Sequence, residues 1–295
     1  MWDSVVTITQ TPYLLRPFLL VLMLGIVAGP VGTIVNLRHA EFSAEAMVHS
    51  VFPGIVIGVI TAGLGGITLG GGIAAAVTAL ALTALAQRYA RLPEAATAVV
   101  LTSFYSLGVV LSLRKGDKSG QLEALMFGRL LEFSDARLIE SASICLFALL
   151  LIAVTWHMHI AYSFDPITAR LQGVNPLLVN LTLNLAIAAV IVAASAAIGV
   201  LLAVGFLVVP GATARLIART PRAMATIATA ATIIGGFLGM ATMLIDSPRP
   251  ISPQAAVTFG MLAMYLLALI VRTILSRVAT NSSPSPQVRK EPANV

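Results

Sequence analysis

Apolar stretches of roughly 20 residues, the length that one α-helix needs to cross a bilayer, recur along almost the whole chain. Charged residues make up only 10% of the 295 residues, where a soluble domain has about a quarter. The sequence therefore predicts an all-α integral membrane protein, a polytopic helical bundle of about eight or nine transmembrane helices. The spans are expected at about residues 17–36, 46–64, 67–87, 95–113, 138–158, 177–197, 198–218, 223–245 and 255–275.

Glycines predict where these helices turn and where they touch. The apolar run 177–217 is too long for one helix, so a break is expected within Ser195–Gly199. A second tight turn is expected at the glycines of 65–66 and 70–72. Glycine pairs four residues apart allow two helices to approach closely in lipid. These pairs are Gly25 with Gly29, Gly54 with Gly58, and Gly235 with Gly239.

Basic residues in the short connections predict the orientation in the plasma membrane, because such residues accumulate on the cytoplasmic side. Alternating spans place most of them at one end, which puts the N-terminus outside and the C-terminus in the cytoplasm. Their scatter does not suggest a nucleic-acid partner. The transmembrane domain is expected over residues 1–278, and the Pro- and Ser-rich residues 279–295 are expected to form a disordered cytoplasmic tail. The residues of the basic end are Arg38, Arg88, Arg91, Arg170, Arg215, Arg219, Arg222, Arg272 and Arg277, whereas Arg114, Lys115 and Lys118 fall on the other side.

Two ionisable residues, Glu45 and His49, stand four apart at the head of an apolar run in "AEFSAEAMVHSVFPG". On a helix they share one face, about 6 Å apart, and their oxygen and nitrogen donors suit manganese, iron or zinc. Pro53 frees the carbonyl of His49 or bends the helix. Spacing alone more often reflects an acid near the positive end of a helix dipole. Membrane depth, where ionisable groups are costly, favours a metal site.

Other polar residues carry weaker signals. His157 and His159 are two apart, on different helix faces near a span end, and are interpreted as interfacial side chains. Asn184 is expected to hydrogen-bond between helices, Cys145 to lie in the core, and Glu94 to occupy the first turn of a helix. No G-x-x-x-x-G-K-[ST] loop is present in the sequence, so any ATP-binding site would belong to another chain.

Four segments resemble, in order, motifs of the membrane permeases of zinc and manganese ABC importers. They are "LRHAEFSAEAMVHSVFPGIVIG" at 37–58, "MFGRLLEFSDARL" at 126–138, "FDPITARLQGV" at 164–174 and "AIGVLLAVGFLVVPGATARLI" at 197–217. The resemblance extends over roughly residues 15–275. It implies a type II ABC importer permease fold, with a permease homodimer in the bilayer over two copies of a separate ATPase.

The resemblance also implies the activity: import of a divalent metal ion, manganese or zinc and with iron as a third candidate, by alternating access. An extracytoplasmic metal-binding protein would deliver the ion. The chain itself would be no enzyme and would hold no permanent cofactor, the metal being its cargo. Glu45 and His49 fall on the metal-contacting acid and imidazole, although Glu45 replaces the family's usual Asp with a side chain one methylene longer. The ATPase-coupling loop is expected to contain Phe164, Asp165, Pro166, Arg170 and Gly173.

Two other classes of function stay open at this point. A secondary carrier or channel without an ATPase would need more acids within its spans than this chain has. An intramembrane zinc protease would need a motif such as H-E-x-x-H, and "EAMVH" supplies only one histidine. An ATPase and a metal-binding lipoprotein encoded beside this chain would favour the importer.

Overall fold

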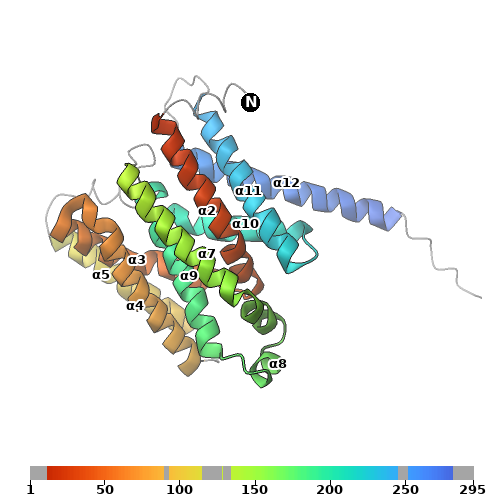
Figure 1. Cartoon of the computed structure of the whole chain (residues 1–295), viewed down its shortest axis with the longest axis horizontal. Coiled ribbons are helices and arrows are strands. Elements are labelled where there is room, and N and C mark those ends of the chain that lie inside the picture. The colour runs from red at the N-terminus through yellow and green to blue at the C-terminus, as the bar shows by residue number, and fades with distance from the viewer. Residues whose placement is uncertain (1–11, 90–92, 115–127, 129–133, 245–251, 282–295) are drawn as a thin grey trace, which may run out of the picture.

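The computed structural model describes residues 12–89, 93–114, 128, 134–244 and 252–281, and its elements within these ranges are helices (Figure 1). They are α2 (Pro12–Leu37), α3 (Glu41–Ala62), the short 3-10 helix η1 (Gly63–Gly65), α4 (Gly66–Arg88), α5 (Pro93–Arg114), α7 (Asp135–Phe164), α8 (Pro166–Leu171), α9 (Pro176–Ile198), α10 (Val200–Ile217), α11 (Pro221–Thr242) and α12 (Pro253–Asn281).

The helices have the lengths and the apolar composition of membrane spans. In the described part of the chain, eight are long and apolar enough to cross a bilayer, and the apolar part of α10, Leu202–Ile217, is shorter. Large apolar side chains are exposed on the outer faces, such as Leu113 (74% exposed) and Val154 (80% exposed), where lipid would cover them. The predicted all-α polytopic bundle is therefore confirmed, and each of the nine expected spans corresponds to a helix.

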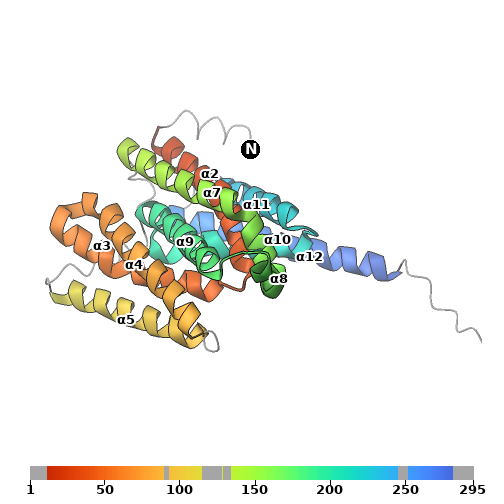
Figure 2. The same cartoon turned by 60° about the horizontal axis from the view of Figure 1, so that its bottom comes forward.

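The bundle has two groups of helices joined by two central ones. The first group is α3, α4 and α5, and the second is α2, α11 and α12. Helices α9 and α10 lie between them, and α7 covers α2 and α9. Figure 2 shows α5 on one flank of the bundle and α2, α7 and α11 on the opposite flank. The central helices contribute several of the largest fully buried side chains, namely Phe206, Ile187, Ile191 and Ile198, and α2 contributes Leu20, Leu24 and Ile34.

Each predicted glycine pair lies at a close helix–helix contact. A Cβ atom added to Gly54 would lie 2.2 Å from the carbonyl oxygen of Gly70, and one added to Gly58 would lie 2.0 Å from that of Gly66. Gly70 is therefore part of the α3–α4 contact and lies inside α4. The prediction of a turn at residues 70–72 was wrong. The turn before α4 is formed by Gly63–Gly65, and residues 70–72 lie inside α4.

The other two pairs join the second group of helices. A Cβ atom on Gly29 of α2 would lie 2.0 Å from the Thr229 hydroxyl of α11. One on Gly239 of α11 would lie 2.4 Å from the Cα of Val257 in α12. The four-residue spacing thus identified real contact surfaces, as expected for membrane helices whose packing depends on close backbone approach.

The break between α9 and α10 falls at Gly199, inside the predicted interval. Its φ of 84° and ψ of 160° lie in a region that only glycine occupies without strain. Pro30, Pro53 and Pro210 instead lie inside continuous helices. The chain is therefore interrupted at the glycine and continuous at these prolines.

The helices alternate in direction, so their connections gather at two ends. At one end Arg215 of α10 donates to the Asn36 carbonyl of α2 at 3.0 Å, and Arg38 reaches α9. We call this the basic end, and the described arginines in its short connections include Arg38, Arg88, Arg170, Arg215, Arg219 and Arg222. At the opposite end Arg16 of α2 pairs with Asp135 of α7 at 2.6 Å.

The second half of α12 extends beyond the rest of the bundle (Figure 1). Its apolar side chains are exposed around the helix, for example Leu267, Ile270 and Ile274. The helix continues to Asn281, which is three residues past the expected end of the transmembrane domain at residue 278. The remainder of the expected tail, residues 282–295, lies outside the described residues.

Candidate functional site

Glu45 and His49 lie one turn apart on α3, on a face that is turned away from the core. Their neighbours Ala46, Met47 and Val48 are at most 1% exposed, whereas Glu45 is exposed and His49 is half-buried. At 1.5 Å per residue, His49 lies about 12 Å along the helix from its start at Glu41. The pair is thus on a face of a membrane-spanning helix that the described chain leaves partly uncovered.

The imidazole of His49 is positioned by an aromatic side chain of α5. The rings of His49 and Tyr105 meet edge to face, with centroids 5.3 Å apart, and Tyr105 also lies 6.0 Å from Phe52. Gly108 permits this approach, because a Cβ there would lie 3.1 Å from the nitrogen of Pro53. Helix α5 therefore packs against the turn of α3 that contains Pro53 and restricts the His49 ring.

The described part of the chain offers few ligands for an ion. No group of three or more His, Cys, Asp or Glu side chains within it could surround a metal. Glu45 and His49 supply two donors, where a closed structural zinc site has four. Glu41 lies one turn before Glu45 and is half-buried, so ionisable residues recur at 41, 45 and 49. Glu41 was not among the predicted site residues, although it has the same four-residue spacing from Glu45.

The junction between α2 and α3 is tightly held. His39 takes a left-handed conformation with φ of 52°, and the Ala40 N–H donates to the Val35 carbonyl at 2.9 Å. The preceding Arg38 donates to the side chain of Asn180 on α9 and lies 5.1 Å over the ring of Tyr162 on α7. Burial lowers the pKa of the Arg38 guanidinium from its ordinary value, and Tyr162 opposes that shift. The junction that begins α3 is therefore tied to both α7 and α9.

The expected coupling loop forms the short helix α8 at the basic end. Asp165 caps it by accepting hydrogen bonds from the backbone N–H of Ile167 at 3.1 Å and of Thr168 at 3.0 Å. Hydrogen bonds from Thr168, and then from Ile167, hold the pKa of Asp165 below its ordinary value. Pro166 occupies the start of the helix, where its missing N–H costs nothing. Gly173 ends the segment with φ of 88°.

Helix α8 is bonded to α7 and presents apolar side chains outward. Arg170 donates to the Tyr162 hydroxyl at 3.1 Å. Phe164 at the end of α7 is 68% exposed, and Ile167 and Leu171 of α8 are 74% and 84% exposed. We call these three the α8 apolar face. Tyr162 thus contacts both Arg170 and Arg38, and neither contact was predicted from the sequence.

Of the remaining predictions for polar side chains and Cys145, some are confirmed and one is wrong. Asn184 donates to the Thr83 hydroxyl of α4 at 3.0 Å, and Cys145 is buried, so both interpretations are confirmed. His157 is exposed, as an interfacial side chain would be. The same expectation was wrong for His159, which is fully buried with its Nε2 at 3.2 Å from the Thr182 hydroxyl.

One expected motif falls mostly on residues that the structure does not describe. Within the motif at 126–138, residues 126–127 and 129–133 lie outside the described ranges. Gly128 is described, and its carbonyl accepts a hydrogen bond from Gln254 at 2.9 Å.

Comparison with known proteins gives the family. The model of the ABC 3 transport family matches residues 10–272. The manganese transport system membrane protein MntC of Halalkalibacterium halodurans is 28% identical over 228 residues, which cover 77% of each chain. The chelated iron transport system membrane protein YfeD of Yersinia pestis is 27% identical over 228 residues, covering 77% of this chain and 76% of that one.

The fold agrees with a solved structure. PsaBC from Streptococcus pneumoniae, solved in complex with a Fab, superposes with a TM-score of 0.73 over 90% of this chain and 94% of that one, at 23% identity. The resemblance indicated by the four sequence motifs is confirmed by the family match. The chain is a multi-pass membrane permease and belongs to the ABC 3 transport family.

Proposed function

We propose that this chain is the membrane subunit of an importer that moves a divalent transition metal ion into the cytoplasm by alternating access, driven by a separate ATPase. The observation that carries the proposal is the pair Glu45 and His49, ionisable residues on a partly uncovered face of a membrane-spanning helix. Such residues are costly in a membrane unless they serve an ion path. The relatives named for manganese and iron transport support a metal as cargo.

A second copy of the chain would complete the site. An acid on an exposed helix face cannot favourably contact lipid, so the face with Glu45 needs a cover. A two-fold symmetric partner would bring its own copies of Glu45 and His49 to the same axis. Two oxygen and two nitrogen donors from different subunits could hold an ion while the cavity is closed and release it when the subunits move apart.

The α8 apolar face is the proposed contact with the ATPase. It is exposed at the basic end, and the arginines of the short loops predict that this end is cytoplasmic. Apolar side chains at this exposure suit a protein partner better than water. Arg170 and the Gly173 turn fix the position of α8 relative to α7. An extracytoplasmic metal-binding protein would then deliver the ion to the opposite end of the bundle.

Manganese is the first candidate for the cargo. Carboxylate oxygen suits a hard ion such as manganese, whereas imidazole suits zinc and iron as well. With one of each per chain, the ligand types favour manganese slightly, and the order of intrinsic affinities favours zinc. The delivering protein would therefore contribute much of the selectivity.

The test is uptake of labelled manganese in cells that lack their own importers and express this chain with its ATPase. His49→Ala should abolish uptake while co-purification with the ATPase is retained. Glu45→Gln should also lose uptake, and Glu45→Asp should retain it because the carboxylate stays. Glu140→Gln on α7 is the control, since it neutralises an exposed acid far from α3.

Two outcomes would refute the proposal. Normal uptake by His49→Ala would show that His49 is not part of the metal site. Loss of uptake by Glu140→Gln to the same extent as by Glu45→Gln would show that the loss comes from a general effect of charge. A secondary carrier would move the metal without any dependence on the partner ATPase. Uptake that persists when the partner ATPase is made inactive would favour that class.

A further inference from the structure

A cavity of about 390 Å³ lies between α7 and α11 at the basic end. Both helices pack against α2 and, within the described residues, make little contact with each other. The volume is within the range of ligand sites. The cavity is lined on α7 by Trp156, His157, Ile160 and Ala161, and on α11 and the residue before it by Thr220, Pro221 and Arg222.

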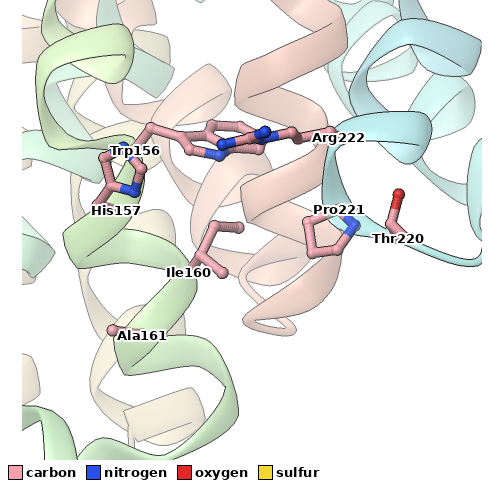
Figure 3. Close-up of a pocket in the computed structure, with 7 residues that line it drawn as sticks. All are labelled: Trp156, His157, Ile160, Ala161, Thr220, Pro221 and Arg222. Atoms are coloured by element: carbon pink, nitrogen blue, oxygen red, sulfur yellow. The ribbon is translucent and has the colours of Figure 1, made fainter.

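The cavity is apolar toward the basic end and cationic further in. Helix α7 runs toward this end and finishes at Phe164, so Ile160 lies about 6 Å and Trp156 about 12 Å before the end of the helix. Figure 3 shows Trp156 and Arg222 extending toward each other from opposite walls, with Ile160 and Pro221 facing each other below them. A group that enters from the basic end therefore meets apolar side chains first, and the guanidinium and the indole N–H beyond them.

The inner part of the cavity has donors without acceptors. Within the described residues, neither Arg222 nor His157 has a hydrogen-bond or ion-pair partner in the protein, and the lining contains no acid. An arginine side chain keeps its charge at any physiological pH and offers a planar fork of donors that matches a carboxylate. The cavity is thus suited to a carboxylate that reaches it through an apolar mouth.

The mouth of the cavity is continuous with the α8 apolar face. Phe164 of that face follows Ile160 by four residues and Ala161 by three, so these side chains lie along one side of α7. Helix α8 begins only two residues after Phe164. A single partner surface at the basic end can therefore cover the α8 apolar face and the mouth of the cavity together.

We propose that the ATPase partner inserts an acidic side chain into this cavity, where its carboxylate pairs with Arg222. Apolar neighbours of that acid would pack against Ile160 and Pro221 at the mouth. The inference rests on the proposed function, which places the ATPase against the α8 apolar face. Paired hydrogen bonds between arginine and a carboxylate are among the strong ones in proteins, and an apolar mouth that excludes water strengthens them further.

This contact would give the ATPase a hold on a second group of helices. Helix α8 follows α7, whereas Arg222 belongs to α11, which packs against α2 and α12. Because α7 and α11 are joined mainly through α2, a movement of α8 alone would reach α11 only indirectly. An acid held by Arg222 would make α11 follow the ATPase directly.

The test is the affinity of the full chain, purified in detergent, for the ATPase. Arg222→Gln should weaken binding about tenfold, the effect of one lost hydrogen bond between charged groups, and should make the remaining affinity less sensitive to salt. Arg222 is exposed, so the fold should tolerate the change. Arg219→Gln is the matched control, because Arg219 is exposed nearby but does not line the cavity, and its affinity should equal that of the wild type.

A second variant identifies the acid. Arg222→Lys keeps the charge and supplies an amine, which a carbodiimide joins to a carboxylate in contact with it. Mass spectrometry should find this position joined to an aspartate or glutamate of the ATPase. Arg219→Lys, treated in the same way, should not give that cross-linked peptide.

Leu171→Glu on the α8 apolar face separates this inference from the proposed function. If Leu171→Glu loses the ATPase and Arg222→Gln keeps the wild-type affinity, the inference fails and the proposed function stands. If the wild-type chain does not bind the ATPase, both fail. Equal losses for Arg222→Gln and Arg219→Gln would show diffuse attraction between charges and overturn the inference. So would a cross-link from Arg222→Lys to an acid of this chain, in the same or a second copy.

Discussion

Replacement of Gly70 by alanine tests the α3–α4 contact that supports the candidate metal site. A Cβ atom at this position would lie 2.2 Å from the Gly54 carbonyl oxygen and 3.0 Å from the Gly58 Cα. These are backbone atoms, so no side chain can rotate away. A carbon–oxygen separation of about 3.3 Å is the usual close limit. The two helices must therefore separate by about 1 Å for Gly70→Ala to be accommodated.

The expected cost follows from overpacking. Forcing an extra group into a packed contact costs about 1–3 kcal/mol, and the value should be near the upper end because two backbones must move. Alanine regains about 0.5–1 kcal/mol through its better helix propensity. The net loss is about 2 kcal/mol. For a chain of 295 residues, with an unfolding entropy of about 2.1 cal/mol/K per residue, that corresponds to a fall of about 3 °C in the unfolding midpoint.

Gly72→Ala is the matched control on the same helix. No atom lies within 4 Å of a Cβ built at Gly72, so this variant should match the wild type or gain about 0.5–1 kcal/mol. Thermal unfolding in detergent and manganese uptake would be measured for both variants. Gly54 is five residues after His49 on α3, so Gly70→Ala should also reduce uptake. Equal midpoints and equal uptake for the two variants would contradict this packing of α3 against α4.

Three further changes address the basic end. Tyr162→Phe removes the hydroxyl that accepts a hydrogen bond from Arg170 but keeps the ring beneath Arg38. ATP hydrolysis should therefore continue with less metal transported per ATP. An unchanged ratio of metal transported to ATP hydrolysed would argue against a role for the Arg170–Tyr162 contact. The lowered pKa of Asp165 means that its cap is intact above the ordinary carboxyl pKa, about 4, and is lost as the pH falls through the lower folded value. Hydrogen exchange of α8 should therefore be constant from about pH 5 to 8 once corrected for the intrinsic rate, and Asp165→Asn should raise it throughout. Gly173→Ala has open space but a left-handed φ, so it should lower stability by about 1 kcal/mol in thermal unfolding, and no change would mean that this backbone relaxes freely.

The span pattern could be predicted from the sequence because the bilayer imposes a length on every helix. The glycine pairs could be predicted as contacts because lipid offers no hydrophobic gain for helix association, which leaves close packing. The sequence could not separate a turn glycine from a packing glycine. Gly65 lies in the turn and Gly70 in the helix, and the difference arises from what α3 presents opposite each position.

The candidate site was predictable only in part. The spacing and the cost of charge in a membrane pointed to Glu45 and His49. Their surroundings depend on residues far away in the chain, and no local pattern identifies such partners. Tyr105 beside His49 comes from α5, and the exposure of Glu45 follows from which helices happen to cover α3. The burial of His159 is of the same kind, since Thr182 on α9 supplies its partner.

The contacts around Tyr162 give a physical connection between the two parts of the proposed function. A movement of α8 would act on Tyr162 through Arg170, and Tyr162 lies against Arg38, two residues before the N-cap Ala40 of α3. Arg38 is also held by Asn180, so α9 resists the same movement. A pull on α8 therefore reaches the start of the helix that carries His49 about 12 Å further on. If this connection transmits motion, Tyr162→Phe and His49→Ala should impair different steps of transport. The first should spare metal binding and lower transport per ATP, and the second should remove metal binding itself.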